Sequence, residues 1–273
     1  MIKSKENFYI PNTEIWTCSS KDNRLYKIFV YIPNTPTPQN GFPVIYLLDG
    51  NANFGSFVEN IRLQTKTSAK TGIHPAVLIG IGYETTEPYS TERYLDFTFD
   101  SDQKKLPKNP QGAEWPPHGG GENFLFFLEE KLKPIVEQNI PINTKKQMIV
   151  GHSLGGLFVL FALFTNPSSF QYYIASSPSI HWNEEALLKK LHLFPERLNR
   201  IESSKLLLTV GEKEKSHFTN MHQKAIVLSN KLANYHGKAF EHFFHEFKNE
   251  DHLTVLLPLI NKTIAFLNDK QID

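Results

Sequence analysis

The segment from Gly151 to Gly156, which reads G-H-S-L-G-G, constrains the fold of this chain more than any other stretch. Residues 148–150 before it are apolar and have the length and branching of a buried strand, and residues 157–164 after it have the length of a buried helix. The pattern G-x-S-x-G between a strand and a helix makes a sharp turn that leaves a serine hydroxyl at its tip. Ser153 is therefore the candidate nucleophile.

The turn needs glycines in this segment for a steric reason. A turn this tight brings neighbouring backbone close together, so a Cβ at Gly151 or Gly155 is expected to collide. The helix that begins at Ser153 directs its free N–H groups toward the serine, where they can stabilise negative charge. An ordinary serine in a glycine-rich turn is the alternative, and the strand and helix on either side disfavour it.

The composition is that of an ordinary globular protein and narrows the possible partners. Apolar residues make up 40% and charged residues 21% of the chain, and the net charge of +1 provides no basic field for a nucleic acid. Cys18 is the single cysteine, so no intrachain disulfide forms. Residues 1–11 lack an apolar signal segment, and the longest apolar run is far shorter than the roughly 18 residues of a membrane span. We expect a cytoplasmic protein without a membrane or nucleic-acid partner.

Short apolar strands alternate with segments of helical period along most of the chain. The expected strands are residues 8–19, 25–32, 44–48, 76–81, 148–150, 172–175, 206–210 and 239–247. The expected helices are residues 54–66, 122–139 with a kink at Pro134, 157–164, 184–193, 217–235 and 255–267. This alternation predicts an α/β fold, a mostly parallel sheet with helices on both faces. No repeat or linker interrupts it, which predicts a single domain over residues 1–273.

Residues 83–121 are the exception to this alternation. They are rich in Pro, Gly, Thr and aromatic residues and show no sustained periodicity. Unstructured connections of this length in a compact domain are usually lids or binding loops. Ligands of such sheets bind beyond the carboxyl ends of the strands. We therefore expect a lid-like insertion at the active-site edge, with a mobile excursion as the alternative.

A serine hydroxyl is a weak nucleophile and needs a histidine base that a third group orients. When the serine lies on this kind of turn, the acid and then the histidine follow it along the chain. The loop after the next-to-last expected strand contains Glu212 and Glu214, and the loop after the last strand contains His252. His252 is the predicted general base. Glu214 is preferred over Glu212 as the acid because it lies further past its strand, although some hydrolases manage without this third group.

The negative charge on the reacting oxygen needs two backbone N–H donors, one from the residue after the nucleophile and one from the loop after an earlier strand. Leu154 supplies the first. The second is expected from Gly50 or its neighbour Asn51, and Gly50 is preferred because a glycine allows close approach to substrate.

Several stretches together resemble the esterase D-like group of α/β-hydrolases, and within it the trilactone siderophore esterases. The turn at Ser153 identifies only the superfamily, whereas the L-D-G-N-A and R-Y-L-D-F-T stretches point to the narrower group. The similarity runs from about Phe8 to the end of the chain. The stretches are residues 47–52, 93–98, 119–137, 151–156 and 177–180.

This resemblance implies an α/β-hydrolase fold. It also implies hydrolysis, through an acyl-enzyme, of the ester bonds of a ferric catecholate trilactone of the bacillibactin or enterobactin type, with iron released inside the cell. The implied catalytic residues are Ser153, Glu214 and His252, with Leu154 and Gly50 as oxyanion donors. Iron belongs to the substrate, so no metal site and no cofactor of the protein is expected.

The resemblance also implies residues that contact the substrate. Arg93 would help to receive the anionic catecholate complex, unless it pairs structurally with Asp96. Tyr94 and Trp182 would line the pocket, where a flat ring can stack on catechols, and Asn51 would lie at the same site. One departure is visible, because the residue before Trp182 is His181, where another aromatic residue is expected.

Two other functions remain open. A general carboxylesterase or an S-formylglutathione hydrolase would keep the chemistry and change the substrate, and the long segment 83–121 argues mildly against the small, tight pocket of a glutathione thioester hydrolase. A non-catalytic ligand-binding module on a hydrolase scaffold would belong to a different class. Such proteins typically lose the serine or the histidine, and both are present here.

Overall fold

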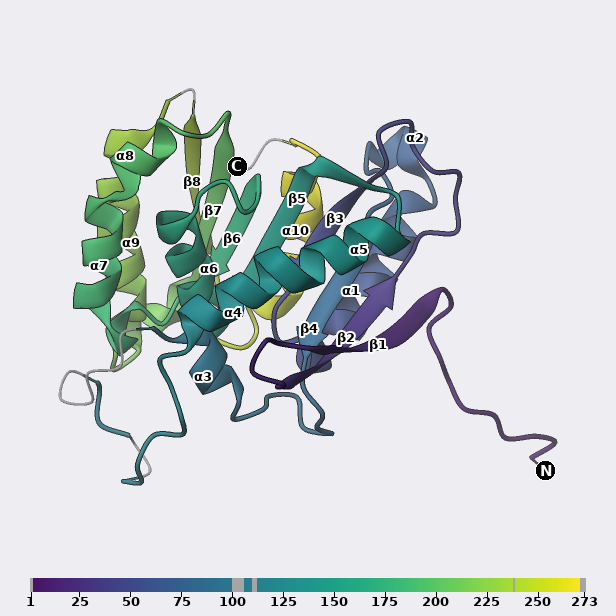
Figure 1. Cartoon of the computed structure of the whole chain (residues 1–273), viewed down its shortest axis with the longest axis horizontal. Helices are drawn as coiled ribbons and strands as arrows, with labels where there is room; N and C mark the ends of the chain where they lie inside the picture. Colours follow the sequence, from purple (N-terminus) through teal and green to yellow (C-terminus); the bar gives the residue numbers. More distant parts are fainter. Residues whose placement is uncertain (1, 100–105, 110–111, 238, 271–273) are drawn as a thin grey trace.

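The computed structural model describes residues 2–99, 106–109, 112–237 and 239–270. Within this part of the chain, eight strands form one sheet in the order β1-β2-β4-β3-β5-β6-β7-β8 (Figure 1). From β4 to β8 all neighbours are parallel, and only β1–β2 and β2–β4 are antiparallel, which confirms the predicted mostly parallel sheet. The strands are β1 (Thr13–Ser19), β2 (Leu25–Tyr31), β3 (Phe42–Leu47), β4 (Val77–Gly82), β5 (Ile142–His152), β6 (Tyr172–Ser176), β7 (Ser204–Gly211) and β8 (Phe240–Phe247).

Helices cover both faces of the sheet. Figure 1 shows α4 and α5 crossing in front of the strands and α10 behind them. The α-helices are α1 (Gly50–Thr65), α2 (Ser68–Thr71), α3 (Arg93–Phe97), α4 (Gly121–Phe127), α5 (Lys133–Asn139), α6 (Leu154–Thr165), α7 (Glu184–His192), α8 (Phe194–Leu198), α9 (Met221–Leu232) and α10 (Leu256–Leu267). Shorter turns are the π turn η2 (Leu128–Leu132) and the 3₁₀ turns η3 (Ile180–Trp182), η4 (Glu212–Ser216) and η5 (Ala233–Tyr235).

Alternate side chains of the central strands fill two separate cores. In β3, Val44 and Tyr46 belong to the core that contains α6, whereas Ile45 and Leu47 belong to the core that contains α1 and α10. Every residue of α6 from Leu154 to Phe164 is buried. A helix that is apolar all round is stable only inside a protein, and each buried Leu or Phe contributes about 1.5–3 kcal/mol. The helix that follows Ser153 is therefore held firmly in the core.

Two helices begin at places that the sequence pattern did not predict. α1 begins at Gly50, four residues before the predicted start, directly at the end of β3. α9 begins at Met221 and not at His217, because residues 212–216 form the turn η4 and His217 ends it. Close to the kink predicted at Pro134, the π turn η2 interrupts the regular helix just before that proline and joins α4 to α5 (Figure 1).

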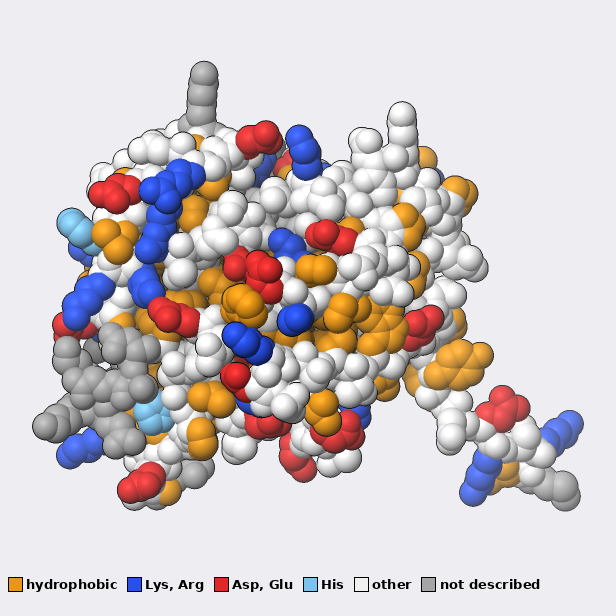
Figure 2. Space-filling view, viewed as in Figure 1, with side chains coloured by type: hydrophobic (Ala, Val, Ile, Leu, Met, Phe, Trp, Pro, Cys, Tyr) orange, Lys and Arg blue, Asp and Glu red, His pale blue; other side chains and the backbone are white. Residues whose placement is uncertain are grey.

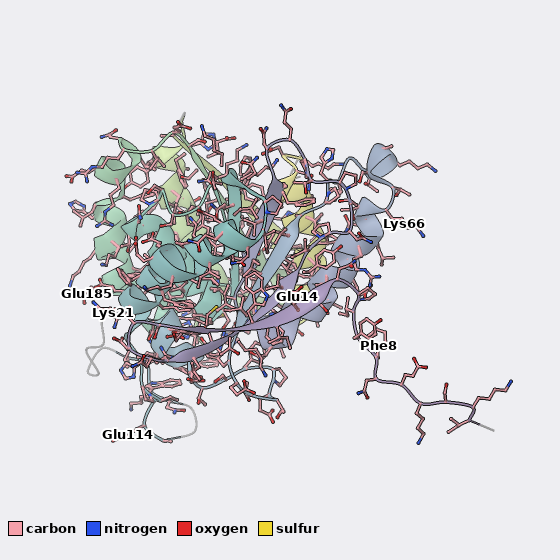
Figure 3. All side chains as sticks on the ribbon, turned by 45° about the vertical axis from the view of Figure 1, so that its right-hand side comes forward. Phe8, Glu14, Lys21, Lys66, Glu114 and Glu185 are labelled. Carbon is pink, nitrogen blue, oxygen red and sulfur yellow. The ribbon has the colours of Figure 1, made fainter. Side chains whose placement is uncertain are left out.

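The segment 83–121 is more regular than predicted. Residues 93–97 form α3, and Phe99 pairs with Gly120 in an isolated β-bridge that closes the segment at its base. Positions 100–105 and 110–111, which the prediction of a lid-like insertion also covers, lie outside the described residues. In Figure 3, Glu114 of this segment lies at the outer edge of the molecule, away from the sheet.

A buried carboxylate ties α3 to the sheet. Asp96 accepts hydrogen bonds from the guanidinium of Arg24, from the hydroxyl of Tyr26 at 3.2 Å and from the hydroxyl of Tyr83 at 3.0 Å. Tyr26 lies in β2 and Tyr83 directly follows β4. Asp96 itself is fully buried, so these donors replace the water that its charge has lost.

Charged side chains of both signs are interspersed over the face seen in Figure 2, without a field of one sign. This distribution agrees with the net charge of +1. Among the helices that the structure describes, none combines the length and the apolar character needed to cross a membrane.

We expect Asp96→Ala to lower the free energy of unfolding by about 3–5 kcal/mol, because it leaves the Arg24 guanidinium and two buried hydroxyls without their acceptor. Urea denaturation measures the change. Glu92→Ala is the control, since Glu92 is half exposed and lies 3.8 Å from Arg24, and its loss should change stability by less than about 1 kcal/mol. Equal effects of the two substitutions would contradict the anchoring role of Asp96.

Candidate active site

Ser153 lies between β5 and α6 in a strained backbone conformation. Its φ of 58° and ψ of −118° fall where residues with a side chain are rare, and such strain costs about 1–3 kcal/mol. The neighbouring strand holds the turn: the Ser153 N–H donates to the carbonyl of Ser176 at 3.0 Å, and the Ser153 carbonyl accepts from the N–H of Ser179 at 3.1 Å. These two hydrogen bonds maintain the strained conformation of Ser153, and the Ser153 hydroxyl lies at the edge of the sheet.

The glycines around Ser153 allow this close packing, though not all in the predicted way. A Cβ on Gly151 would lie 2.3 Å from the carbonyl oxygen of Gly155, and one on Gly156 would lie 2.8 Å from the carbonyl oxygen of Ser176. A Cβ on Gly155 would make only ordinary contacts at 3.5 Å outside its own helix. The prediction is thus confirmed for Gly151 and wrong for Gly155, because the crowded second position is Gly156.

His252 lies in the loop between β8 and α10, and its Nε2 is 3.1 Å from Ser153 Oγ. The two residues are 99 positions apart, and they meet because parallel strands open their carboxyl ends at one edge. Gly211, the last residue of β7, makes room for this loop, since a Cβ there would lie 2.6 Å from the carbonyl oxygen of Glu250. The N–H of Lys213 donates to that same carbonyl at 2.9 Å. The loop that carries His252 is thus held against the end of β7.

Of the two candidate acids, the structure places Glu214 beside the histidine. Glu214 Oε2 lies 3.4 Å from His252 Nδ1, and the residue is only 2% exposed. Glu212 points elsewhere and accepts a hydrogen bond from the backbone N–H of Asn249 at 3.0 Å. The preference for Glu214 over Glu212 agrees with this geometry.

The second oxygen of Glu214 is also occupied. Oε1 accepts hydrogen bonds from the hydroxyl of Ser177 and from the N–H of Gly211, the latter at 3.0 Å. Burial alone would raise the pKa of Glu214, but the bonds from His252, Ser177 and Gly211 outweigh it and hold the pKa below its ordinary value. The ionised carboxylate can only accept, so the proton of the neutral imidazole resides on Nδ1 and Nε2 faces Ser153 as an acceptor.

Backbone donors for a negative charge are available at two helix starts. Leu154 is the first residue of α6, and Gly50 and Asn51 are the first two of α1. The first N–H groups of a helix have no partner within the helix, so each can donate to a ligand. The structure also gives a steric reason for the glycine at position 50, because a Cβ there would lie 2.8 Å from the backbone of Gly80 in β4.

The side chain of Asn51, which was predicted to lie at the substrate site, holds a loop, and its contact with substrate stays a prediction. Its amide oxygen accepts from the N–H of Tyr83 at 2.9 Å, and its amide nitrogen donates to the carbonyls of Tyr83 at 3.0 Å and Thr85 at 3.3 Å. These bonds fasten the chain after β4 to the start of α1.

Arg93 pairs with Asp49, and not with Asp96 as the structural alternative proposed. Its Nε and one terminal nitrogen each donate to one oxygen of Asp49 at 2.8 Å, a bidentate contact between two buried side chains. Asp96 is occupied by Arg24. Arg93 still contributes to the wall of the cavity next to Ser153, but its charge is balanced by Asp49.

A cavity opens beside Ser153, and the predicted residues Tyr94 and Trp182 lie in its wall. Part of the segment 83–121 also lies in this wall. Within the described part of the chain, the cavity is lined by Arg93, Tyr94, Pro107, Lys108, Trp115, Ser153, Leu154, Ser179, His181, Trp182, His217, Phe218, Thr219, Met221 and His252.

Three aromatic rings form one side of this cavity. Tyr94 and Trp182 are joined by Trp115, with ring centroids 5.5 Å from Tyr94 and 4.6 Å from Trp182. Trp115 was not predicted to lie at the site, and the aromatic content of the irregular segment was the signal that could have indicated it. His217 was not predicted there either, and its ring lies 5.9 Å from that of His252. Burial lowers the pKa of His181 to about 4, so this histidine is uncharged in the cavity at neutral pH.

Comparisons with known proteins agree with this geometry. The model of a family described as putative esterase matches residues 19–255. The chain is 47% identical over 261 residues to the ferri-bacillibactin esterase BesA of Bacillus subtilis strain 168. The aligned region covers 95% of this chain and 90% of that protein.

Two solved structures are also similar. A crystal structure of the BES protein from Bacillus cereus superposes with a TM-score of 0.90 at 39% identity, covering 98% of this chain and 100% of that one. The siderophore hydrolase EstA from Aspergillus nidulans superposes with a TM-score of 0.84 at 28% identity, covering 98% and 99%. With these neighbours, the α/β-hydrolase fold that the sequence predicted is confirmed.

We expect Gly211→Ala to slow the reaction of Ser153 with a fluorophosphonate probe by about 100-fold or more, because the added methyl displaces the loop that carries His252 and an error of about 1 Å has this effect. The rate of labelling and the melting temperature are measured together. Gly237→Ala is the control, since a Cβ there meets nothing within 4 Å. Unchanged labelling of Gly211→Ala would show that the histidine loop does not depend on this contact.

The lowered pKa of Glu214 predicts a pH-dependent contribution to stability. A carboxylate whose pKa is depressed on folding stabilises the protein above its unfolded value, near 4.5, and this contribution is lost as the pH falls through the folded value. Glu214→Gln should therefore be less stable than the natural protein at pH 7, and the difference should shrink below about pH 4.5. Urea denaturation across this range tests it, and a difference that grows on acidification would refute the expectation.

Proposed function

The chain belongs to the putative esterase family, whose model spans residues 19–255, and we propose that it is a serine carboxylic-ester hydrolase acting on trilactone siderophores. The observation that carries the proposal is the chain of contacts from Glu214 through His252 to Ser153 at the mouth of an aromatic-lined cavity. The similar proteins that bear the names of siderophore esterases and hydrolases give the substrate class.

The first half of the reaction forms an acyl-enzyme. Ser153 Oγ attacks the carbonyl carbon of the ester while its proton passes to Nε2 of His252. The ionised Glu214 stabilises the imidazolium that results. The carbon–oxygen bond to the alkoxide then breaks, and the alkoxide leaves with the proton that His252 held.

The second half releases the acid. A water molecule attacks the acyl carbon and gives its proton to His252, and the bond to Ser153 Oγ breaks as that oxygen recovers a proton. In both halves the carbonyl oxygen becomes negative, and we assign its stabilisation to the N–H of Leu154 and to the start of α1, at Gly50 or Asn51. The turn at residues 49–51 thus serves the reaction through its backbone.

We propose that the substrate is a ferric catecholate trilactone and that the cleavage frees its iron in the cytoplasm. The rings of Tyr94, Trp115 and Trp182 provide flat apolar surfaces on which catechols can stack. Arg93 and Lys108 are the cationic groups of the described wall, and the pairing of Arg93 with Asp49 weakens its attraction for an anion. Iron enters as part of the substrate. The reaction needs only groups of the protein, and we propose no resident metal or cofactor.

The segment 83–121 supplies Tyr94 and Trp115, and through Arg93 it contacts the start of α1. We propose that it sets the shape of the substrate pocket. That it closes over the substrate as a lid stays a prediction.

The test compares kcat/KM for an iron-loaded catecholate trilactone, for its metal-free form and for p-nitrophenyl acetate, with products identified by mass spectrometry. We expect the trilactone to be preferred by at least about 100-fold and to yield catechol–amino acid conjugates, because its larger contact area is used in the transition state. Ser153→Ala should reduce turnover by about 10⁴-fold or more. Ser168→Ala, at an exposed serine after α6, is the control.

Each other outcome points to one of the alternatives. A preference for the simple ester by orders of magnitude would indicate a general carboxylesterase, and S-formylglutathione can be assayed alongside it. Failure of folded protein to react with a fluorophosphonate at Ser153 would indicate a binding module. Faster hydrolysis of the metal-free trilactone would keep the esterase and remove the ferric complex as its preferred substrate.

A further inference from the structure

The turn Ser177-Pro178-Ser179 follows β6 and contacts both ends of the catalytic chain of residues. The hydroxyl of Ser177 donates to Glu214 Oε1. The hydroxyl of Ser179 lies 3.1 Å from Ser153 Oγ. The mechanism above uses neither hydroxyl, although the second one touches the reacting atom.

Ser179 is held in place by more than this contact. Its N–H donates to the carbonyl of Ser153 at 3.1 Å, and the residue is only 4% exposed. The turn also packs closely on the start of α6, since a Cβ on Gly156 would lie 3.2 Å from the Cα of Pro178. The backbone that carries the Ser179 hydroxyl is therefore held beside Ser153.

The direction of the bond between the two serine hydroxyls follows from the acid. Because ionised Glu214 only accepts, His252 carries its proton on Nδ1 and presents Nε2 as an acceptor. Ser153 then gives its single proton to Nε2, from which it lies 3.1 Å away. Ser153 Oγ then has only lone pairs left for a further hydrogen bond. In the contact between the two serine hydroxyls, Ser179 therefore donates its proton to the hydrogen bond and Ser153 Oγ accepts.

We propose that Ser179 is a further catalytic residue, whose hydroxyl donates a hydrogen bond to Ser153 Oγ whenever that oxygen carries negative charge. The proposal rests on the esterase function proposed above. It adds a side-chain donor on the nucleophile, distinct from the backbone donors on the substrate's carbonyl oxygen. No proton is transferred from Ser179.

The bond has an effect in both halves of the reaction. During acylation, Ser153 Oγ becomes negative as His252 takes its proton, and the donor from Ser179 strengthens because hydrogen bonds to charged acceptors are roughly twice as strong as neutral ones. During deacylation, Ser153 Oγ is the leaving group, and the same donor stabilises it until His252 returns the proton. An interaction that is stronger in the transition state than in the ground state accelerates the reaction.

The experiment measures kcat, the rate of fluorophosphonate labelling and the pH profile of labelling for Ser179→Ala and Ser179→Thr. We expect Ser179→Ala to lower kcat and the labelling rate by about tenfold to 100-fold, the usual effect of a lost hydrogen bond to a charged group. Its pH profile should fall in height without moving along the pH axis, because the contact between His252 and Glu214 is intact. Ser179→Thr retains a hydroxyl and should recover most of the rate.

Ser204→Ala is the matched control. Ser204 is a buried serine at the start of β7, and among the described residues its hydroxyl has no hydrogen-bond partner. The proposal is overturned if Ser179→Ala reacts as fast as the natural protein or faster, if its loss is matched by Ser204→Ala, or if its pH profile moves. If the natural protein itself neither labels nor hydrolyses esters, the proposed function fails, and that result is distinct from a failure of Ser179 alone.

Discussion

The contact of Gly151 with the carbonyl of Gly155 is the constraint on which the site depends. Only a residue without a Cβ allows β5 to turn into α6 within such a short distance, and the turn forces Ser153 into a positive φ. The helix α6, buried from Leu154 to Phe164, then fixes the position of this turn relative to the sheet. His252 and Glu214 follow the strands β8 and β7 at the same sheet edge, so their distances to Ser153 depend on the spacing of the parallel strands.

Much of the fold and the central residues could be predicted from the sequence because both follow from local rules. Continuous apolar runs separated by helical periods indicate a covered parallel sheet. The meeting of Ser153, Glu214 and His252 could be predicted because each follows a recognisable strand, and such a sheet brings the ends of its strands together. In the structure, His252 lies within hydrogen-bond distance of both Glu214 and Ser153.

The remaining features depend on contacts between distant residues that no local pattern records. Arg93 and Asp49 are 44 positions apart, and nothing near either one indicates that they pair. Trp115 lies in a segment without periodicity, so its place beside Tyr94 and Trp182 is set by tertiary packing. The close approach of Gly50 to Gly80 in β4 could not be predicted either, because no local pattern shows which strand lies against the start of α1.

The pairing of Arg93 with Asp49 shortens the range over which this part of the cavity attracts an anion. A lone guanidinium would act as a monopole, whose attraction extends through solvent over about one Debye length. Joined to a carboxylate at 2.8 Å, it presents a dipole, whose potential decays faster with distance. An incoming anion therefore experiences this part of the wall only at contact range. Discrimination there depends on molecular shape after arrival, with little guidance during approach.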